Sequence, residues 1–473
     1  MTKAIFGLEI HVQLATKSKL FCSCSTNYES VEPNENTCPI CTGFPGARPK
    51  LNKTAIEYGL LVAKALNCKI NREIFFSRKN YFYPDLPKNF QITQYELPLA
   101  VNGYLRITGK DIRIRRIHLE EDPGKLIHYG GDITSAEYTL IDYNRSGIPL
   151  LEIVTEPDFT STKEIREFLT KLQSILEHLG VFDSTREASM RIDTNISLEG
   201  GERVEIKNLS GFKNIEKAIN YEIVRQEHLK RVGIPIERET RHFDPQTKTT
   251  VSLRKKEFEE DYGYIFETDL PKIEISEEWL KSLEEKLPEL PDMRIDRFIK
   301  EYGLREREAK IIVYTDKALA DFFEDCCRIY RNPKEIAKWI VTDLLKCLNW
   351  HGISIKESKV NPEIFVELLK LIENGKITER FAKEIIKEIV TTGESPKEII
   401  KKKGLEKIDE EKLEKIVENV LNENRKAVED YKAGKMKALQ FLIGIVLKET
   451  KMTADPKKVR EIINRKIGIG IKN

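Results

Sequence analysis

The sequence lacks the landmarks of several large protein classes. No run of about 18 apolar residues occurs in its 473 residues, so no membrane-spanning helix is expected. It has no GxxxxGK[ST] loop, no GxGxxG turn, no GxSxG elbow and no HExxH pair. Any nucleotide chemistry must therefore hold phosphate through a metal ion and scattered basic side chains, in a fold other than the P-loop and dinucleotide-binding folds.

A secretion signal and a strong overall charge are missing as well. The opening residues, MTKAIFGLEIHVQL, are too polar for a signal peptide, so we expect a cytoplasmic protein whose thiols stay reduced. The 79 Lys and Arg residues nearly balance the 77 Asp and Glu residues, which leaves a net charge of +2. The whole chain therefore carries no polyelectrolyte signature.

The charge is nevertheless uneven along the chain. Residues 431–473 contain eleven Lys and Arg against three Asp and Glu, a local excess of +8. A basic tail on a near-neutral body indicates an anionic partner such as RNA, although a solvated helical face gives the same pattern. Lysines at five positions are the candidate phosphate contacts: Lys435, Lys437, Lys448, Lys451 and Lys458.

The length and the residue patterns predict more than one domain. Strand-like alternation dominates to about residue 290, and helical patterns follow. Asn332-Pro333 and Asn361-Pro362 each place a capping side chain before a proline of the first turn. We therefore predict an α+β protein, with a large N-terminal domain over residues 1–290, an all-α domain over 291–404 and a small helical tail domain over 405–473.

Acidic residues beside apolar segments indicate a metal site. Residues 4–14 alternate as a half-buried strand, which points Glu9 and His11 to the same side. Further along, two acidic clusters flank strand-like apolar runs: Glu120-Glu121-Asp122, and Glu152 with Glu156 and Asp158. Carboxylates placed there need a compensating positive charge, and hard oxygen ligands suit Mg²⁺. The alternative is a hairpin with solvated acidic turns.

Four cysteines predict a zinc site. Cys22 and Cys24 are followed, after thirteen residues, by Cys38 and Cys41, in turn-rich sequence. Two close pairs at this separation are typical of a closed tetrahedral shell of thiolates, which leaves no position for chemistry. We expect a structural staple; two disulfides are the alternative.

Residues 77–96, SRKNYFYPDLPKNFQITQYE, interleave basic, aromatic and amide side chains around two prolines. We expect an ordered loop that suits phosphate contact by its basic side chains (Arg78, Lys79 and Lys88) and stacking of its aromatic rings on an adenine or a terminal base. A packed aromatic loop is equally compatible. Strands expected at 190–198 and 203–214 carry further inward polar residues, notably Arg191, Asp193, Asn195, Glu205, Lys207 and Asn208.

Long stretches of the chain resemble one family. They are GLEIHVQL (7–14), CTGFPGARPKLN (41–52), RKNYFYPDLPKNFQITQYE (78–96), HLEEDPGK (118–125), DYNRSGIPLLEIVTEPD (142–158), MRIDTNIS (190–197), EIKNLSGF (205–212) and GKMKALQFLIGIVLKETKMTADPKKV (434–459). Together they look like the B subunit of the bacterial aspartyl/glutamyl-tRNA amidotransferases. The resemblance covers essentially the whole chain.

The resemblance implies a fold, an activity and partners. The N-terminal domain would be a cradle of the glutamine-synthetase/guanido-kinase type that holds ATP and Mg²⁺. It would be an ATP-dependent carbon–nitrogen ligase that phosphorylates the side-chain carboxylate of Asp-tRNA(Asn) or Glu-tRNA(Gln) and amidates it. Ammonia would come from glutamine through a channel from an amidase, the A subunit, and a small C subunit would complete a heterotrimer. The helical and tail domains would hold the tRNA.

The resemblance also implies roles for individual residues. His11, one carboxylate of the Glu120-Glu121 pair (Glu121 is favoured) and Glu152 would bind Mg²⁺. Glu9, Lys79, Lys88 and Asp193 would be catalytic. Tyr81, Arg191 and Lys207 would bind the nucleotide, although Tyr81 and Lys207 fit structural roles too. The zinc cysteines occur in only some members, which agrees with a stabilising role.

Two other functions fit the same features. The chain could be a non-catalytic tRNA-binding scaffold whose metal site is only structural. It could also be an unrelated metal-dependent nuclease, which would degrade tRNA with Mg²⁺ and without ATP.

Overall fold

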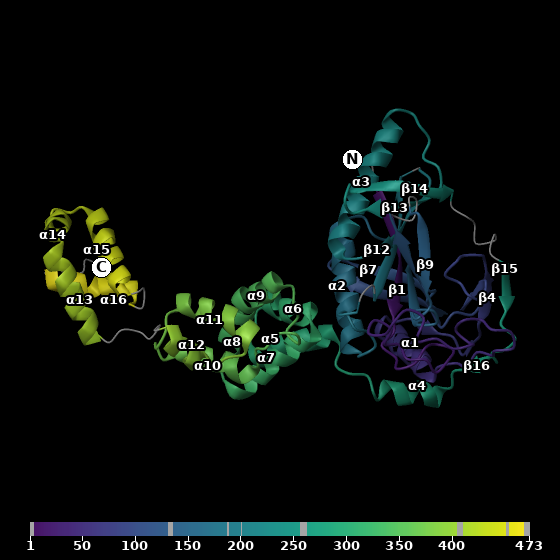
Figure 1. The fold of residues 1–473 in the computed structure, drawn as a ribbon, viewed down its shortest axis with the longest axis horizontal. Coiled ribbons are helices and arrows are strands. Elements are labelled where there is room, and N and C mark those ends of the chain that lie inside the picture. The colour runs from purple at the N-terminus through teal and green to yellow at the C-terminus, as the bar shows by residue number, and fades with distance from the viewer. Residues whose placement is uncertain are drawn as a thin grey trace. The chain divides into compact units, whose positions relative to one another are not determined.

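The computed structural model describes residues 4–130, 136–186, 189–199, 201–255, 263–403, 410–450 and 454–467. The chain divides into two compact units, Met1–Arg294 and Ile295–Asn473 (Figure 1). The first is built on a large sheet and the second consists of helices in its described residues. The predicted mixed α+β class is therefore confirmed.

Twelve strands form the main sheet of the first unit, and β1 (Ala4–Gln13) lies in its middle. Among the described strands the path is antiparallel except where β12 pairs with β13. Its order is β14 (Thr249–Lys255), β13 (Glu239–Asp244), β12 (Val204–Leu209), β11 (Met190–Leu198), β1, β10 (Pro149–Thr155), β7 (Lys110–Glu121), β5 (Phe90–Thr93), β4 (Ser77–Asn80) and β15 (Gly263–Phe266). β6 (Ala100–Ile107) also pairs with β7, and β2 (Lys69–Ile70) pairs with β6.

Two small two-stranded sheets accompany the main sheet. One joins β3 (Glu73–Ile74) to β16 (Ile273–Glu274). The other is a hairpin of β8 (Lys125–Tyr129) and β9 (Tyr138–Asp142).

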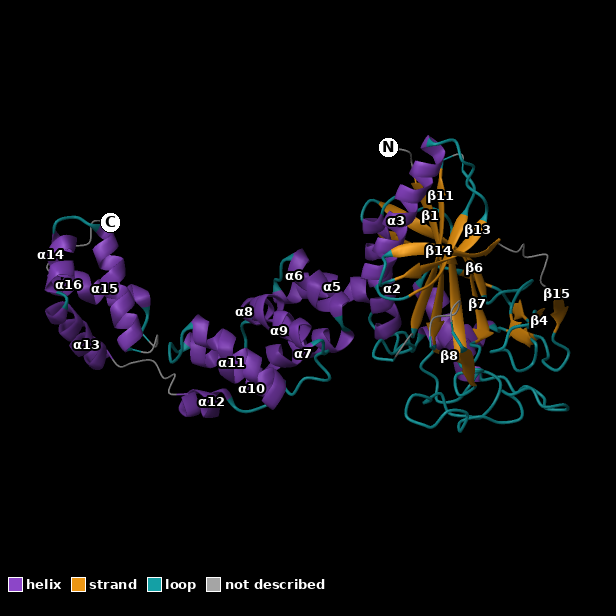
Figure 2. Cartoon of the chain, turned by 45° about the horizontal axis from the view of Figure 1, so that its top comes forward, coloured by secondary structure: helices purple, strands orange, loops and turns teal. Residues whose placement is uncertain are grey.

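The two faces of β1 differ as the alternation predicts. Phe6, Leu8, Ile10 and Val12 are buried in the core of the first unit, which leaves the opposite face for polar groups. Helices α1 (Lys53–Ala65), α2 (Thr162–His178) and α3 (Phe212–Arg231) contribute apolar side chains to the same core, and α2 and α3 lie along one side of the sheet (Figure 2). α4 (Glu277–Glu284) completes the helices of this unit.

The expectation of one loop over residues 77–96 is wrong. β4 and β5 pair as antiparallel strands there, and only the residues between them, with both prolines, form turns. Both prolines lie in these turns, so they do not interrupt either strand, and the polar side chains of β4 find partners distant in sequence. Arg78 of β4, for example, donates two hydrogen bonds of 2.7 Å to Glu267.

The helical unit contains two separate hydrophobic clusters, over residues 295–400 and 413–463. The two Asn-Pro helix starts are confirmed: Asn332 and Asn361 each accept a backbone hydrogen bond in the first turn. The helices are α5 (Pro291–Tyr302), α6 (Glu306–Thr315), α7 (Lys317–Ile329), α8 (Pro333–Trp339), a π-helix (Ile340–Leu344), α9 (Leu345–His351), α10 (Pro362–Glu373), α11 (Glu379–Thr392), α12 (Pro396–Lys403), α13 (Glu410–Glu423), α14 (Arg425–Lys432), α15 (Met436–Glu449) and α16 (Pro456–Ile467). Among the described residues, no helix combines the length and the hydropathy needed to cross a bilayer.

Candidate active site

Two histidines and two glutamates meet on the polar face of the sheet, and we call them the histidine–carboxylate cluster: His11, His118, Glu120 and Glu152. His11 Nε2 lies 3.5 Å from Glu152 Oε2 and 3.7 Å from Glu120 Oε1. His118 Nε2 lies 3.1 Å from the same Glu152 oxygen and 3.9 Å from Glu120 Oε2. One ligand atom each from His11, Glu120 and Glu152 lies within 4.8 Å of the others, so one cation can contact all three side chains.

Strand register builds this cluster. In the antiparallel pair of β1 and β10, His11 lies directly opposite Glu152, and Glu152 lies directly opposite His118 of β7. Directly opposed residues point to the same face of a sheet. Glu120 follows His118 by two positions and therefore shares that face.

Electrostatics couple the members of the cluster. Burial would lower the pKa of His11, but the hydrogen bond to Glu152 and the charges of Glu152 and Glu120 raise it to about 9. Burial and the nearby Glu152 charge raise the pKa of Glu120. Burial opposes ionisation of Glu152 too, yet His118 and His11 hold the pKa of that carboxyl well below its usual range. These shifts favour a protonated His11 beside an ionised Glu152.

The structure places Glu120, and not the favoured Glu121, beside His11 and Glu152. Consecutive strand residues point to opposite faces, so only one of the two glutamates can join the cluster. Glu121 instead forms an ion pair with Lys88 and accepts the backbone N–H of Ile92 at 2.9 Å.

A second acidic cluster lies beside the first and contains Glu9, Asp193 and Glu205, whose ligand atoms also lie within 4.8 Å of one another. Glu9 of β1 is directly opposite Asp193 of β11. Lys207 Nζ lies 3.6 Å from Asp193 and 4.0 Å from Glu205. Glu205 also accepts a hydrogen bond of 3.0 Å from Thr240. The structure therefore brings together the predicted residues Glu9, Asp193 and Lys207.

Asp122 orients the predicted residue Arg191. Arg191 lies on β11 opposite His11 and donates a hydrogen bond of 2.7 Å to Asp122. Burial opposes its charge, but Asp122 raises the pKa of the guanidinium. Asp122 is almost fully buried and also accepts a hydrogen bond of 2.9 Å from Gln13.

The remaining predicted residues, Lys79 and Tyr81, lie at the β4 side of the sheet. Lys79 Nζ stands 5.7 Å from the centre of the Tyr81 ring, within cation–π range. Burial and the charge of Glu152 raise the pKa of Glu120, and the charge of Lys79 opposes that increase. Lys79 therefore acts electrostatically on the histidine–carboxylate cluster.

The four predicted cysteines come together as one cluster. Their sulfur atoms lie within 4.8 Å of one another, and Cys38 Sγ is 3.8 Å from Cys41 Sγ. Sulfur atoms at about 2.3 Å from a tetrahedral zinc ion lie about 3.8 Å apart, so the shell fits zinc. None of the eight cysteines, all within the described residues, forms a disulfide. The hydrogen bond from Cys22 lowers the pKa of Cys41 to about 4, against the effect of burial and with help from Lys19.

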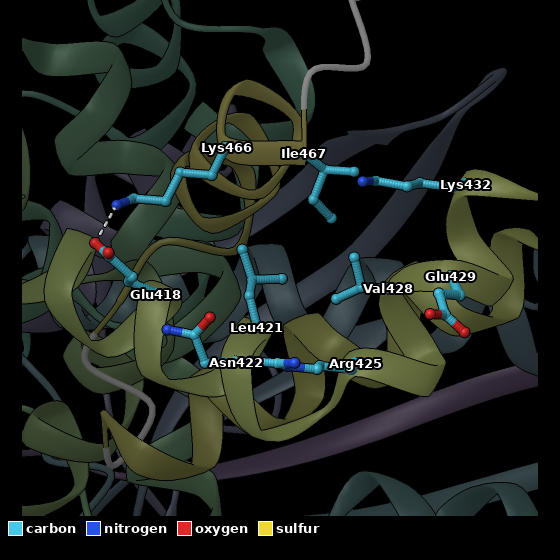
Figure 3. A pocket seen from close by; sticks show the side chains of 9 residues that line it. All are labelled: Glu418, Leu421, Asn422, Arg425, Val428, Glu429, Lys432, Lys466 and Ile467. Carbon is cyan, nitrogen blue, oxygen red and sulfur yellow. Dashed lines mark hydrogen bonds and ion pairs between the residues drawn. The ribbon is translucent and has the colours of Figure 1, made fainter.

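The tail contains a cavity of about 430 Å³ (Figure 3). Its lining combines three apolar side chains, three basic ones, two acidic ones and one amide: Leu421, Val428, Ile467, Arg425, Lys432, Lys466, Glu418, Glu429 and Asn422. Lys466 forms an ion pair of 2.6 Å with Glu418. Arg425 and Lys432 are exposed, so their charge is available to an anion.

The five predicted tail lysines differ in their surroundings. Lys435 forms an ion pair of 2.8 Å with Asp430, and Lys458 lies 3.5 Å from Glu410. Lys437 and Lys448 lie on α15, and Lys451 falls outside the described residues.

Sequence reasoning missed His118 and gave Glu205 no role. His118 stands two positions before Glu120, so strand alternation applied to β7 would have placed it on the same face. Its Nδ1 is buried and has no hydrogen-bond partner among the described residues. Glu205 depends on the pairing of β11 with β12, which no single stretch of sequence reveals.

Comparison with known proteins first defines a class. Residues 4–281 match the family described as the GatB/GatE catalytic domain, and residues 321–467 match the GatB domain family. Both acidic clusters lie inside the first match.

Three relatives then identify the family. They are the B subunits of aspartyl/glutamyl-tRNA(Asn/Gln) amidotransferase from Saccharolobus solfataricus, Thermotoga maritima and Thermosipho melanesiensis. The first is 48% identical over 469 residues, which cover 98% of this chain and 99% of the relative. The second is 48% identical and the third 49%, each over 475 residues that cover 98% of this chain; they cover 98% and 99% of the relatives. The chain belongs to the family of aspartyl/glutamyl-tRNA(Asn/Gln) amidotransferase B subunits. The family and the enzyme class predicted from the sequence are confirmed.

Proposed function

We propose that this protein uses ATP to phosphorylate the side-chain carboxylate of Asp-tRNA(Asn) or Glu-tRNA(Gln), and then amidates it. The meeting of His11, Glu120 and Glu152 on one face of the sheet is the observation that carries the proposal. Membership of a catalytic-domain family supports an active role over that of a scaffold.

The reaction needs activation because oxide is a very poor leaving group. Transfer of the γ-phosphoryl group from ATP to a carboxylate oxygen gives an acyl phosphate and ADP. Ammonia then attacks the carbonyl carbon, and phosphate leaves with the electrons of the C–O bond. The product is Asn-tRNA(Asn) or Gln-tRNA(Gln).

The histidine–carboxylate cluster suits a divalent cation. Glu120 and Glu152 are buried close together, and two carboxylates in that setting repel each other unless a proton or a cation compensates them. His11, Glu120 and Glu152 would hold Mg²⁺, and His118 orients Glu152. The bound ion would supply Lewis-acid stabilisation of phosphoryl charge.

The surrounding side chains would position the reactants. Glu9 and Asp193, with Glu205, present a second acidic group that can take the cation carried by ATP. Lys79, Arg191 and Lys207 would supply positive charge for phosphate oxygens. Lys88 is paired with Glu121, outside the histidine–carboxylate cluster, so we assign it no direct contact with phosphate. Tyr81 offers a ring for the nucleotide.

The cysteine cluster would hold structural Zn²⁺. All four thiol ligands would be used, so we assign it no open coordination position. We propose that the protein acts in the cytoplasm, where thiols stay reduced.

The names of the relatives, which are B subunits, support a proposal about the partners. We propose that an amidase, the A subunit, sends ammonia through a channel that crosses the boundary between the two proteins, and that a small C subunit completes the heterotrimer. The division into 1–290, 291–404 and 405–473, with a glutamine-synthetase/guanido-kinase type of cradle first, remains our proposal. Arg425 and Lys432 at the tail cavity support a tRNA-contacting role for the last domain.

The decisive experiment is Glu152→Gln in the complex with its amidase partner. ATP hydrolysis that depends on mischarged tRNA should fall by at least about 100-fold, because a ligand carboxylate is lost while the shape is kept. Glu156→Gln is the matched control, since Glu156 pairs with Arg115 and lies outside both acidic clusters. Wild-type hydrolysis in Glu152→Gln would show that the cluster does not serve phosphoryl transfer, which would leave it a structural role, as in the scaffold alternative.

A further inference from the structure

Lys19 is a fully buried lysine in the first unit, with 0% of its surface exposed. A lysine ammonium has three N–H donors and no acceptor, so its burial requires three acceptors. Lys19 Nζ has three: Asn36 O at 3.0 Å, Tyr143 O at 3.4 Å and Cys41 Sγ at 3.6 Å. Each donor of the buried ammonium therefore has an acceptor.

Those acceptors belong to two different parts of the chain. Asn36 and Cys41 belong to residues 22–43, which we call the cysteine-containing segment. Tyr143 belongs to residues 142–148, which we call the bracing segment. Further hydrogen bonds join the same two parts. Asn34 N–H donates to Asp142 Oδ1 at 2.9 Å, and Ser146 Oγ donates to Cys41 O at 3.1 Å.

The bracing segment leads directly into the candidate active site. Gly147 N–H donates to Asp122 O at 2.8 Å, and Asp122 N–H donates to Ile148 O at 2.9 Å. Asp122 in turn orients Arg191. The next residue after the segment, Pro149, begins β10, which carries Glu152.

The cysteine-containing segment also packs against Lys88. Gly43 has a φ of +71°, and a Cβ at this position would lie 2.6 Å from Lys88 Cγ. Lys88 forms the ion pair with Glu121, the neighbour of Glu120. The cysteine-containing segment is therefore linked both to β7, which carries Glu120, and to β10, which carries Glu152.

We propose that Lys19 ties the cysteine cluster to the bracing segment, so that this cluster positions the active-site strands. Lys19 is a positioning residue, because it touches neither acidic cluster. The cysteine cluster then has a role beyond stability: it sets where β10 starts and how Asp122 holds Arg191. The part of this inference that concerns metal affinity rests on the proposed function.

The test compares Lys19→Met with Lys17→Met in the full-length, zinc-loaded chain. Methionine keeps much of the length of the side chain and removes its donors, and Lys17 is an exposed neighbour. Hydrogen–deuterium exchange of residues 142–148 should become about tenfold faster in Lys19→Met, because these amides lose their bracing. Lys17→Met should leave it unchanged. Unchanged exchange in Lys19→Met would overturn the proposal.

A second measurement separates positioning from local support. Mn²⁺ is the probe, titrated by electron paramagnetic resonance. Lys19→Met should weaken Mn²⁺ binding about tenfold, as loss of outer-shell partners does. Faster exchange with wild-type Mn²⁺ affinity would overturn the positioning role. If the wild-type chain bound no Mn²⁺, the proposed magnesium site would fail, while the exchange experiment would still decide whether the bracing exists.

Ser146→Ala guards against misfolding of Lys19→Met. It removes only the hydrogen bond to Cys41 O and adds no bulk. Exchange of residues 142–148 should rise in the same direction, by a smaller factor. Cobalt in place of zinc gives a spectroscopic check, because loss of the Lys19 donor should shift the thiolate-to-cobalt absorption band; an unmoved band in Lys19→Met would contradict the contact with Cys41.

Discussion

His11 and Glu152 face each other across the centre of the main sheet, 141 positions apart in the chain, with Nε2 and Oε2 3.5 Å apart. Glu152 lowers the cost of charging His11, so the imidazole holds its proton to about pH 9 without a cation. A cation and this proton therefore compete for the same carboxylate and the same nitrogen.

Proton release should accompany metal binding. Between about pH 6.5 and pH 9, binding of Mg²⁺ or Mn²⁺ should displace about one proton per ion, and affinity should rise with pH. Calorimetry in buffers of different ionisation enthalpy measures this number. A value of zero at pH 7.5 would show that the ion does not displace the proton of His11.

The same proton should stabilise the metal-free protein. The folded-state pKa of about 9 exceeds the ordinary value of 6.5, so the contribution of His11 is complete below about pH 6.5 and is lost as the pH rises through 9. The difference in unfolding free energy between wild type and His11→Gln, measured by urea denaturation, should shrink across this window. A difference that grows with pH would contradict the assignment.

Substitution of Glu120 and substitution of Glu121 should have different effects on metal affinity. Glu120→Gln removes a member of the histidine–carboxylate cluster and should weaken Mn²⁺ binding by about 10- to 100-fold. Glu121→Gln should change it much less, because Glu121 pairs with Lys88. Equal effects of the two substitutions would show that both carboxylates reach the ion.

His118 should matter although it is not among the predicted ligands. His118→Asn should lower Mn²⁺ affinity by about tenfold, since Glu152 would lose a partner at 3.1 Å. His128→Asn is the control, because His128 lies on the β8–β9 hairpin beside Thr139. Wild-type affinity in His118→Asn would exclude a role in the site.

Zinc removal should destabilise the first unit. Chelation, or Cys38→Ser, should lower the melting temperature, because a structural metal site contributes folding free energy. Elemental analysis of carefully purified protein is the direct check. A zinc content near zero together with an unshifted melting temperature would rule out a zinc site.

The basic groups at the tail cavity should contribute to tRNA affinity. Arg425→Gln with Lys432→Gln should weaken binding and reduce the slope of log affinity against log salt by about one per lost phosphate contact. Lys281→Gln with Lys286→Gln removes the same charge from the first unit as a control. Point substitutions suit this domain better than truncation, because deletion of residues 435–473 would cut through the hydrophobic cluster of residues 413–463.

Local patterns predicted local features well. Alternation alone placed Glu9 and His11 on one face of β1, and cysteine spacing alone identified the four members of the cysteine cluster. The choice between Glu120 and Glu121 was missed because it depends on the register of β7 against β10. The two short strands within residues 77–96 were missed for a similar reason, since their partners lie far along the chain: β4 pairs with β15, and β5 pairs with β7.

The central place of β1 constrains the order of folding. The first strand to be synthesised has both its neighbours, β10 and β11, more than 130 residues further along. Closing such long loops is entropically costly and slow, and β1 has no earlier partner in the main sheet. A ribosome must therefore deliver 152 residues before His11 can meet Glu152, and 193 before Glu9 can meet Asp193. A nascent chain interrupted before Glu152 carries neither site.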